Sequence, residues 1–187
     1  MHKSREAIDK QQEAEMMGNN TFIPMTRRYP ALRGKVLRRD ARIVSRIISA
    51  WDIEHDSEKV LGIFMKEMHI LSDERYWELL RTVWVVCGSM RRIYIFRELF
   101  NSKRSKRYYF STPEEHALLR ELPDVITVYR ATNIPKDGGF SWTLSKQYAN
   151  QYAKMFDKSA IIERQVRKDE VFAYINRNCE EEILIID

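Results

Sequence analysis

The stretch Glu180-Glu181-Glu182-Ile183-Leu184-Ile185-Ile186 decides how this chain folds. Its apolar part is too short for a helix and is rich in β-branched residues, so it predicts a strand. Because successive side chains of a strand point to opposite faces, Glu180 and Glu182 are predicted on one face, which Leu184 and Ile186 continue. An ionised carboxylate at the edge of a buried face needs a cation or hydrogen-bond donors nearby.

Two stretches upstream offer those groups. Arg130 lies in a predicted strand from Asp124 to Ala131, where alternation places it on the same inward face as Ile126 and Val128. The stretch Gly139-Phe140-Ser141-Trp142-Thr143-Leu144 predicts another short strand, and it carries two hydroxyl groups. Each residue alone is also explained by a structural ion pair or by an acidic strand end that faces water.

The ordered set of motifs is more specific than its members. An arginine in a strand, then Ser-x-Thr, then Glu-x-Glu with three apolar residues resembles the arginine–serine–glutamate class of mono-ADP-ribosyltransferases, of a small bacterial or phage type. The resemblance covers about the last third of the chain. The sequence departs from the family's Ser-Thr-Ser pattern, because Trp142 stands in the middle and Thr143 replaces the last serine. The span from Arg130 to Glu182 is also short, which suggests trimmed loops.

The resemblance implies a glycosyltransferase that uses NAD as its substrate and cleaves the nicotinamide–ribose bond. Glu182 would stabilise the oxocarbenium-like centre and accept a hydrogen bond from the ribose 2′-hydroxyl. Arg130 would hold a phosphate or the nicotinamide ribose, and Ser141 would orient Glu182 with the help of Thr143. Glu180 would position and deprotonate the acceptor, which favours an arginine of a target protein. No metal is required.

Aromatic residues near these motifs have two explanations. Ser145 predicts the cap of a helix from Lys146 to Phe156, in which aromatic side chains at i, i+4 and i+8 share one face. They are expected to pack that helix on the sheet. The resemblance implies instead that one aromatic side chain stacks on the nicotinamide ring, and the candidates are Phe140, Trp142, Tyr148 and Tyr152.

The predicted fold class is α+β, with a helical N-terminal half and an ADP-ribosyltransferase-like split β-sheet core. Residues 1–20 are expected to form a flexible or helical arm, 21–122 a basic helical region, and 123–187 the β-rich catalytic part. Residues 21–187 are expected to form one compact domain. Three apolar stripes at helical spacing lie between Ala41 and Phe100, and Thr112-Pro113-Glu114-Glu115 is a helix start.

Positive charge is concentrated in the first part of the chain. Residues 1–110 contain 22 Lys and Arg against 14 Asp and Glu, whereas the remainder contains 10 against 13. The richest segments are Arg27–Arg46 and Lys103–Phe110, where cations in the second alternate with aromatic residues. Both segments are explained by phosphate contacts to a nucleic acid or by an acidic protein partner. Arg27–Arg46, in which Asp40 is the one acidic residue, is also explained by a solvated helix face with a loop, and Lys103–Phe110 by a basic loop that leads into a buried aromatic strand.

Several classes of protein are excluded or disfavoured. No apolar run approaches the roughly 18 to 20 residues of a membrane span, and the first residues lack an export signal, so we expect no membrane partner. A cytoplasmic effector of a bacterial or phage-infected cell is expected. The two cysteines imply no disulfide framework, and the four histidines lack the spacing of metal ligands.

Three functions therefore compete at this point. The first is a mono-ADP-ribosyltransferase that modifies a macromolecule, and a target protein associated with nucleic acid is one such acceptor. The second is an NAD glycohydrolase, with water as the acceptor. The third is a non-catalytic basic module that binds nucleic acid or an acidic protein through Arg27–Arg46 or Lys103–Phe110.

Overall fold

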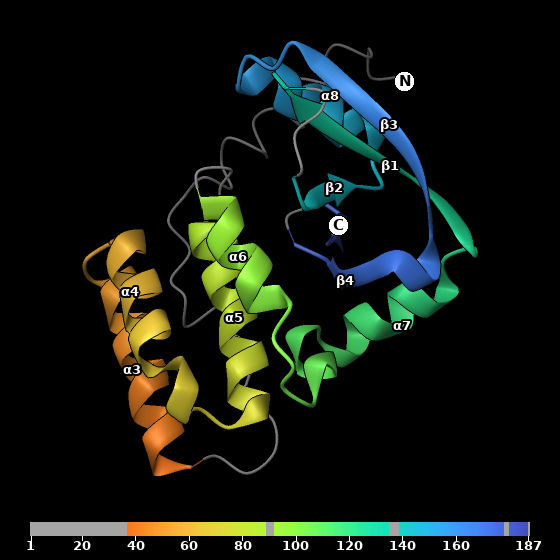
Figure 1. The fold of residues 1–187 in the computed structure, drawn as a ribbon. Helices are drawn as coiled ribbons and strands as arrows, with labels where there is room; N and C mark the ends of the chain where they lie inside the picture. Colours follow the sequence, from red (N-terminus) through yellow and green to blue (C-terminus); the bar gives the residue numbers. More distant parts are fainter. Residues whose placement is uncertain (1–36, 89–91, 135–138, 178–179, 187) are drawn as a thin grey trace, which may run out of the picture. The chain divides into compact units, whose positions relative to one another are not determined.

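The structure, a computed structural model, describes residues 37–88, 92–134, 139–177 and 180–186. Helices come first along the chain and strands follow (Figure 1), so the expected α+β class with a helical first half is confirmed. The described residues divide into two compact units, 37–121 and 122–185, which are treated separately below. The predicted arm, 1–20, lies outside the described residues, and a single compact domain over 21–187 stays a prediction.

The described helices of the first unit are α3 (Arg38–Asp52), α4 (Ser57–Glu67), α5 (Asp73–Cys87), α6 (Ile93–Phe100) and α7 (Pro113–Glu121), with 3-10 turns η1 (Met68–Ile70) and η3 (Arg107–Phe110). Side-chain capping explains where three of them begin, namely α4, α5 and α7. Before α7, the Glu115 amide donates to the Thr112 hydroxyl at 3.2 Å, and the Thr112 amide donates to the Glu115 carboxylate at 2.8 Å. This reciprocal capping box is the one that the sequence predicts.

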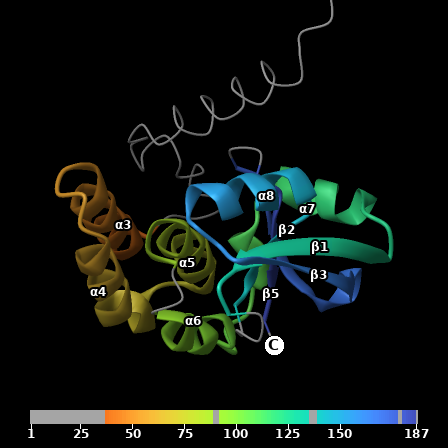
Figure 2. The ribbon, with the colours of Figure 1, turned by 90° about the horizontal axis from the view of Figure 1, so that it is seen from above.

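Within this unit, α3 and α4 lie to the left of α5 and α6 lies below it in the view of Figure 2. Leu79, Leu80 and Val83 on α5 are fully buried, as the apolar stripe predicts. The same helix also buries Arg81, whose guanidinium forms an ion pair at 2.6 Å with the buried Glu115 of α7. This unit therefore combines an apolar core with charges that are paired inside it.

The second unit is built on a five-stranded antiparallel sheet with the strand order β3-β1-β2-β5-β4. Its strands are β1 (Val125–Thr132), β2 (Ser141–Thr143), β3 (Ala160–Arg167), β4 (Val171–Ile175) and β5 (Glu182–Ile185), and a 3-10 turn, η4 (Lys168–Glu170), joins β3 to β4. Strands β1 and β3 pair over their full length. Between β1 and β2, however, the pairing consists of Tyr129 opposite Thr143. The sheet is thus nearly divided at that point.

Helix α8 (Lys146–Met155) follows β2 directly and packs on one face of the sheet (Figure 1). The Ser145 hydroxyl caps it by accepting a hydrogen bond from the Tyr148 amide at 3.1 Å, as predicted. The Lys146 ammonium group lies 5.4 Å from the ring centre of Tyr129 on β1. Because cross-strand partners share a face, α8 covers the face that carries Tyr129 and Thr143.

Among the helices of the described residues, none is long and apolar enough to span a membrane.

Candidate functional site

The serine and the second glutamate of the sequence pattern meet on neighbouring strands. In the β2–β5 ladder, Thr143 lies opposite Glu182 and Ser141 opposite Leu184, so the three polar side chains share one face. The Ser141 hydroxyl donates a hydrogen bond to Glu182 Oε1 at 2.6 Å. Glu182 is 4% exposed, and its Oε2 atom is buried. A buried carboxylate held by a hydroxyl donor is therefore the centre of the site.

Thr143 has a different role from the one that the pattern implies. Its hydroxyl donates to the Glu180 carbonyl at 2.5 Å and accepts from the Ser145 amide at 3.0 Å. The threonine thus ties the backbone before β5 to the start of α8. Thr143 therefore stabilises the backbone around the site, whereas Ser141 contacts the Glu182 carboxylate directly.

Glu180 does not lie on the strand, which corrects the sequence prediction. Strand β5 begins at Glu182, and Glu181 has a left-handed backbone with φ of 44°. The regular alternation of side chains ends at such a residue, so it cannot place Glu180 and Glu182 on one face. The two carboxylates are nevertheless brought together by Arg177, as described next.

Arg177, in the loop after β4, is a site residue that the sequence argument missed. Its Nη2 atom lies 2.9 Å from Glu180 Oε2 and 3.6 Å from Glu182 Oε2. It thereby supplies a cation to the carboxylates, the role that the sequence argument gave to Arg130. Its position three residues before the first glutamate was a possible signal, but side-chain directions in a loop follow no period that the sequence displays.

Arg130 lies at the point where β1 and β2 separate. It is half-buried, while Ile126 and Val128 on the same strand are buried as predicted. Its Nη1 atom donates to the Ser141 carbonyl at 2.8 Å, so the arginine holds the strand that carries the serine. A Cβ atom at Gly139 would collide with this guanidinium. Gly139 is therefore a further site residue, needed for its lack of a side chain.

Two tyrosines of α8 reach the charged cluster. Burial raises the pKa of the Tyr148 phenol, and the charge of Glu180 and a hydrogen bond to it raise the pKa further. Burial also raises the pKa of Tyr152, which senses the charges of Arg130, Glu180, Arg177 and Glu182. The rings of Tyr148 and Tyr152 are 6.3 Å apart between centres. Both predicted aromatic candidates on α8 thus lie beside the carboxylates.

The other two aromatic candidates, Trp142 and Phe140, do not lie beside the carboxylates as Tyr148 and Tyr152 do. Trp142 alternates with Ser141 and Thr143, so it points to the opposite face, where the Arg164 guanidinium lies 6.0 Å from its ring centre. Phe140 is buried, and its carbonyl accepts from the Ile185 amide at 3.0 Å. Trp142 is therefore not brought together with Glu182, and Phe140 belongs to the core.

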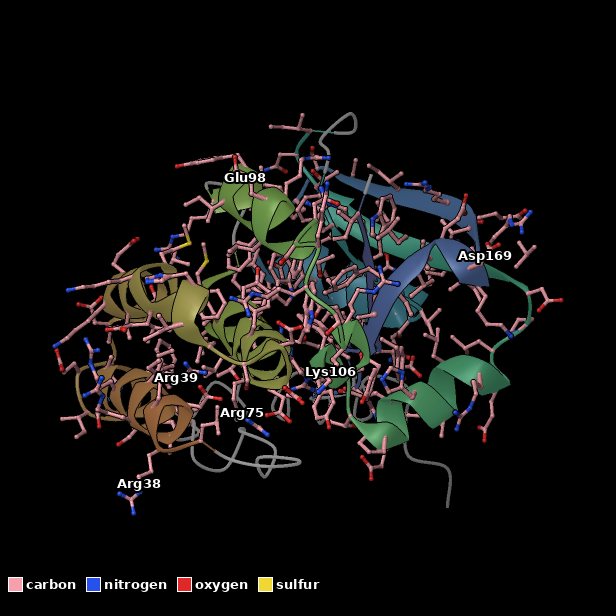
Figure 3. The ribbon with its side chains drawn as sticks, turned by 60° about the horizontal axis from the view of Figure 1, so that its bottom comes forward. Arg38, Arg39, Arg75, Glu98, Lys106 and Asp169 are labelled. Carbon is pink, nitrogen blue, oxygen red and sulfur yellow. The ribbon has the colours of Figure 1, made fainter. Side chains whose placement is uncertain are left out.

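The basic segments of the first unit are only partly described, since Arg27, Arg28, Arg33 and Lys35 lie outside the described residues. Arg38, Arg39 and Arg42 are exposed on α3, and Figure 3 shows Arg38 extending away from the helix. A solvated helix face was one explanation of Arg27–Arg46, but Asp40 does not fit it. It is fully buried and accepts from the Ser72 hydroxyl at 2.6 Å.

In the segment Lys103–Phe110, Arg104 and Lys106 make intramolecular contacts. Arg104 donates to the carbonyls of Leu71 and Met68, each at 2.8 Å, and Lys106 pairs with Glu74. The aromatic residues lie on η3 instead of the strand that was one of the two alternatives. These contacts favour a structural role for this segment over a nucleic-acid groove.

No family model, no curated protein and no solved structure matches this chain. In the described parts of the chain, no group of three or more His, Cys, Asp or Glu side chains is arranged to hold a metal ion. The functional argument therefore depends on the geometry of the site and on the resemblance of its motifs.

Proposed function

We propose that this chain is a mono-ADP-ribosyltransferase, which cleaves NAD and transfers ADP-ribose to an arginine of a target protein. The observation that carries the proposal is the 2.6 Å hydrogen bond from Ser141 to Glu182 on adjacent strands, with Arg130 bound to the Ser141 carbonyl. Glu182 thus contacts the Ser141 side chain, whereas Arg130 contacts the Ser141 main chain from a strand position that alternates with Tyr129 and so belongs to the other face of the sheet. The near-division of the sheet between β1 and β2 supports the same family-like core.

Glu182 is suited to stabilise positive charge at the anomeric carbon. Cleavage of the nicotinamide–ribose bond leaves an oxocarbenium-like ribose, and a fixed carboxylate beside it lowers the free energy of the transition state. Ser141 holds Oε1, so Oε2 is the oxygen that would face the ribose. This oxygen is buried in the structure, and the side chain of Arg177, which is 29% exposed, lies over the pair of carboxylates. Substrate binding therefore requires Arg177 to turn outward.

Glu180 and the α8 tyrosines complete the proposed chemistry. An arginine acceptor is protonated at neutral pH, so it needs a carboxylate that takes its proton as the new bond forms. Glu180 already binds a guanidinium in this structure, and Tyr148 orients it through a hydrogen bond. Tyr152 offers an aromatic surface against which the nicotinamide ring can stack. Arg130 carries the positive charge that would bind the NAD phosphates.

The test follows adenylate-labelled NAD incubated with the full chain, with and without bacterial lysate, and measures both labelled macromolecules and released nicotinamide. Label that appears on protein and disappears in Glu182→Gln supports the transferase. Nicotinamide release without labelled product would replace it with an NAD glycohydrolase. Absence of both signals in a folded protein would refute NAD chemistry at this site.

A second candidate function is binding of an acidic partner through α3, and the exposed Arg38, Arg39 and Arg42 favour it. Contacts of this kind release counterions, so affinity falls steeply with salt. Mobility-shift titrations with duplex DNA and with RNA at several salt concentrations would detect it, and binding that persists unchanged in a variant with all three arginines replaced by glutamine would exclude α3 as the contact.

A further inference from the structure

Arg177 contacts the two site carboxylates unequally. Its Nη2 atom lies 2.9 Å from Glu180 Oε2, which is the distance of a charge-assisted hydrogen bond. The same atom lies 3.6 Å from Glu182 Oε2, which is too long for a hydrogen bond, so this contact is electrostatic only. The guanidinium is therefore bound to Glu180 and covers Glu182 without being bound to it.

The position over Glu182 leaves part of the guanidinium unsatisfied. The Arg177 Nε atom is buried and has no hydrogen-bond partner among the described residues. A buried donor without a partner costs free energy, which the group recovers when it reaches water. The Arg177 side chain is already 29% exposed, and Glu180, at 19%, is more exposed than Glu182, at 5%. Rotation about the contact with Glu180 therefore moves the guanidinium toward solvent and uncovers Glu182 Oε2.

NAD can replace the positive charge that leaves. A carboxylate as buried as that of Glu182 needs a cation or hydrogen-bond donors nearby, and Ser141 supplies one donor. The nicotinamide ring of NAD is positively charged, and the ribose becomes so as the bond to nicotinamide breaks. The substrate thus supplies beside Glu182 the charge that the guanidinium supplies in its absence, so the two compete for one place.

We propose that Arg177 is an autoinhibitory gate, whose guanidinium competes with NAD for the Glu182 carboxylate. The inference depends on the proposed function. The closed arrangement of the structure is the resting state, and NAD binds the fraction of molecules in which the gate is open. The apparent affinity for NAD is reduced by that fraction. The chemical step is unaffected, because the open guanidinium no longer lies over Glu182.

The experiment measures initial rates of nicotinamide release by the full chain over a range of NAD concentrations. In Arg177→Gln the KM for NAD is expected to fall by about fivefold or more, with kcat within about twofold of wild type. Arg177→Lys keeps the charge and is expected to keep the higher KM. Arg167→Gln is the matched control, because it removes an exposed arginine–carboxylate pair, with Asp169, and is expected to leave KM unchanged.

A second measurement does not depend on NAD. Carbodiimide with glycinamide labels accessible carboxylates, and peptide mapping gives the rate at Glu182. Labelling of Glu182 is expected to be about fivefold or more faster in Arg177→Gln than in wild type, because the gate is absent. Glu163, which is 54% exposed, is the internal control and is expected to react equally in both proteins.

The outcomes separate the gate from the proposed function. Nicotinamide release that depends on Glu182, with KM and Glu182 labelling unchanged in Arg177→Gln, would overturn the gate and leave the function standing. A lower kcat with an unchanged KM would also overturn the gate, since Arg177 would then position Glu182 instead of covering it. No release that depends on Glu182 in the folded proteins would overturn both.

Discussion

Any side chain placed at Gly139 is predicted to displace the Arg130 guanidinium and to destabilise the protein. The Gly139 backbone is not left-handed, so alanine meets no conformational barrier there, but the new Cβ atom collides with the guanidinium. The arginine must move and lose its 2.8 Å hydrogen bond to the Ser141 carbonyl. A hydrogen bond from a charged donor contributes about 1.5 to 3 kcal/mol. Replacing glycine by alanine also stabilises the protein by about 0.4 to 1 kcal/mol, because it lowers the conformational entropy of the unfolded chain. The net loss in the free energy of unfolding is about 0.5 to 2.5 kcal/mol.

Thermal unfolding followed by circular dichroism measures this loss. For a chain of this length, the midpoint of Gly139→Ala is expected to fall by about 1 to 10 °C. Gly62→Ala on α4 is the control, because a Cβ there meets no atom within 4 Å. That change is expected to raise stability by about 1 kcal/mol, the usual difference between glycine and alanine in a helix.

A double-mutant cycle decides whether Arg130 is the cause. In an Arg130→Ala background the collision is absent, so Gly139→Ala is expected to be neutral or stabilising. NAD cleavage is expected to fall to a similar degree in Gly139→Ala and Arg130→Ala. A destabilisation of equal size in both backgrounds would refute the steric reasoning, because the added methyl group would then act without the arginine.

Three further predictions concern other parts of the molecule. Arg81→Met is expected to destabilise the helical unit by about 3 to 5 kcal/mol in urea unfolding, because it leaves the buried Glu115 carboxylate without its cation. The control is Lys146→Met, which removes the exposed pair with Glu163 and is expected to change stability by at most about 1 kcal/mol. Burial raises the pKa of the Cys87 thiol from 9.0 to about 12, so its peptide is expected to resist alkylation at pH 8 until the protein unfolds. The thiol ionises more readily in the unfolded chain, so the free energy of unfolding is expected to decline as pH rises from about 9 to about 12. Tyr148→Phe removes the hydrogen bond to Glu180 and is expected to slow ADP-ribose transfer to an arginine acceptor more than hydrolysis of NAD, measured as nicotinamide release. Tyr152→Phe keeps that hydrogen bond and serves as the comparison. Equal losses in both reactions for Tyr148→Phe would contradict a role of Tyr148 in positioning Glu180.

Features that depend on neighbouring residues in the sequence were predictable. Ser145 and the Thr112–Glu115 box each cap a helix as expected, because capping uses atoms within three residues. The strand that carries Ser141 and the one that begins at Glu182 were also found from their β-branched and aromatic content. Pairing of Ser141 with Glu182 was an implication of the resemblance, and the β2–β5 register supplies its physical basis.

Features set by backbone detail or by tertiary contacts were not predictable. Alternation fails at Glu180, since nothing in three successive glutamates marks Glu181 as left-handed. Arg177 becomes a partner of both glutamates through the loop that precedes β5. Asp40 has the sequence context of a solvated residue, but a hydroxyl 32 residues away allows it to be buried. Each of these requires the fold before the contact can be known.

The central claim is that Glu182 promotes cleavage of NAD. The most direct test is the initial rate of nicotinamide release from NAD by the purified chain, compared with Glu182→Gln and with Glu181→Gln. The neighbouring glutamate is the matched control, because its change removes the same charge one residue away. The account predicts a loss of at least a hundredfold in Glu182→Gln, which corresponds to about 2.7 kcal/mol of transition-state stabilisation. It predicts little change in Glu181→Gln. Equal rates for the wild type and both folded variants would contradict the account.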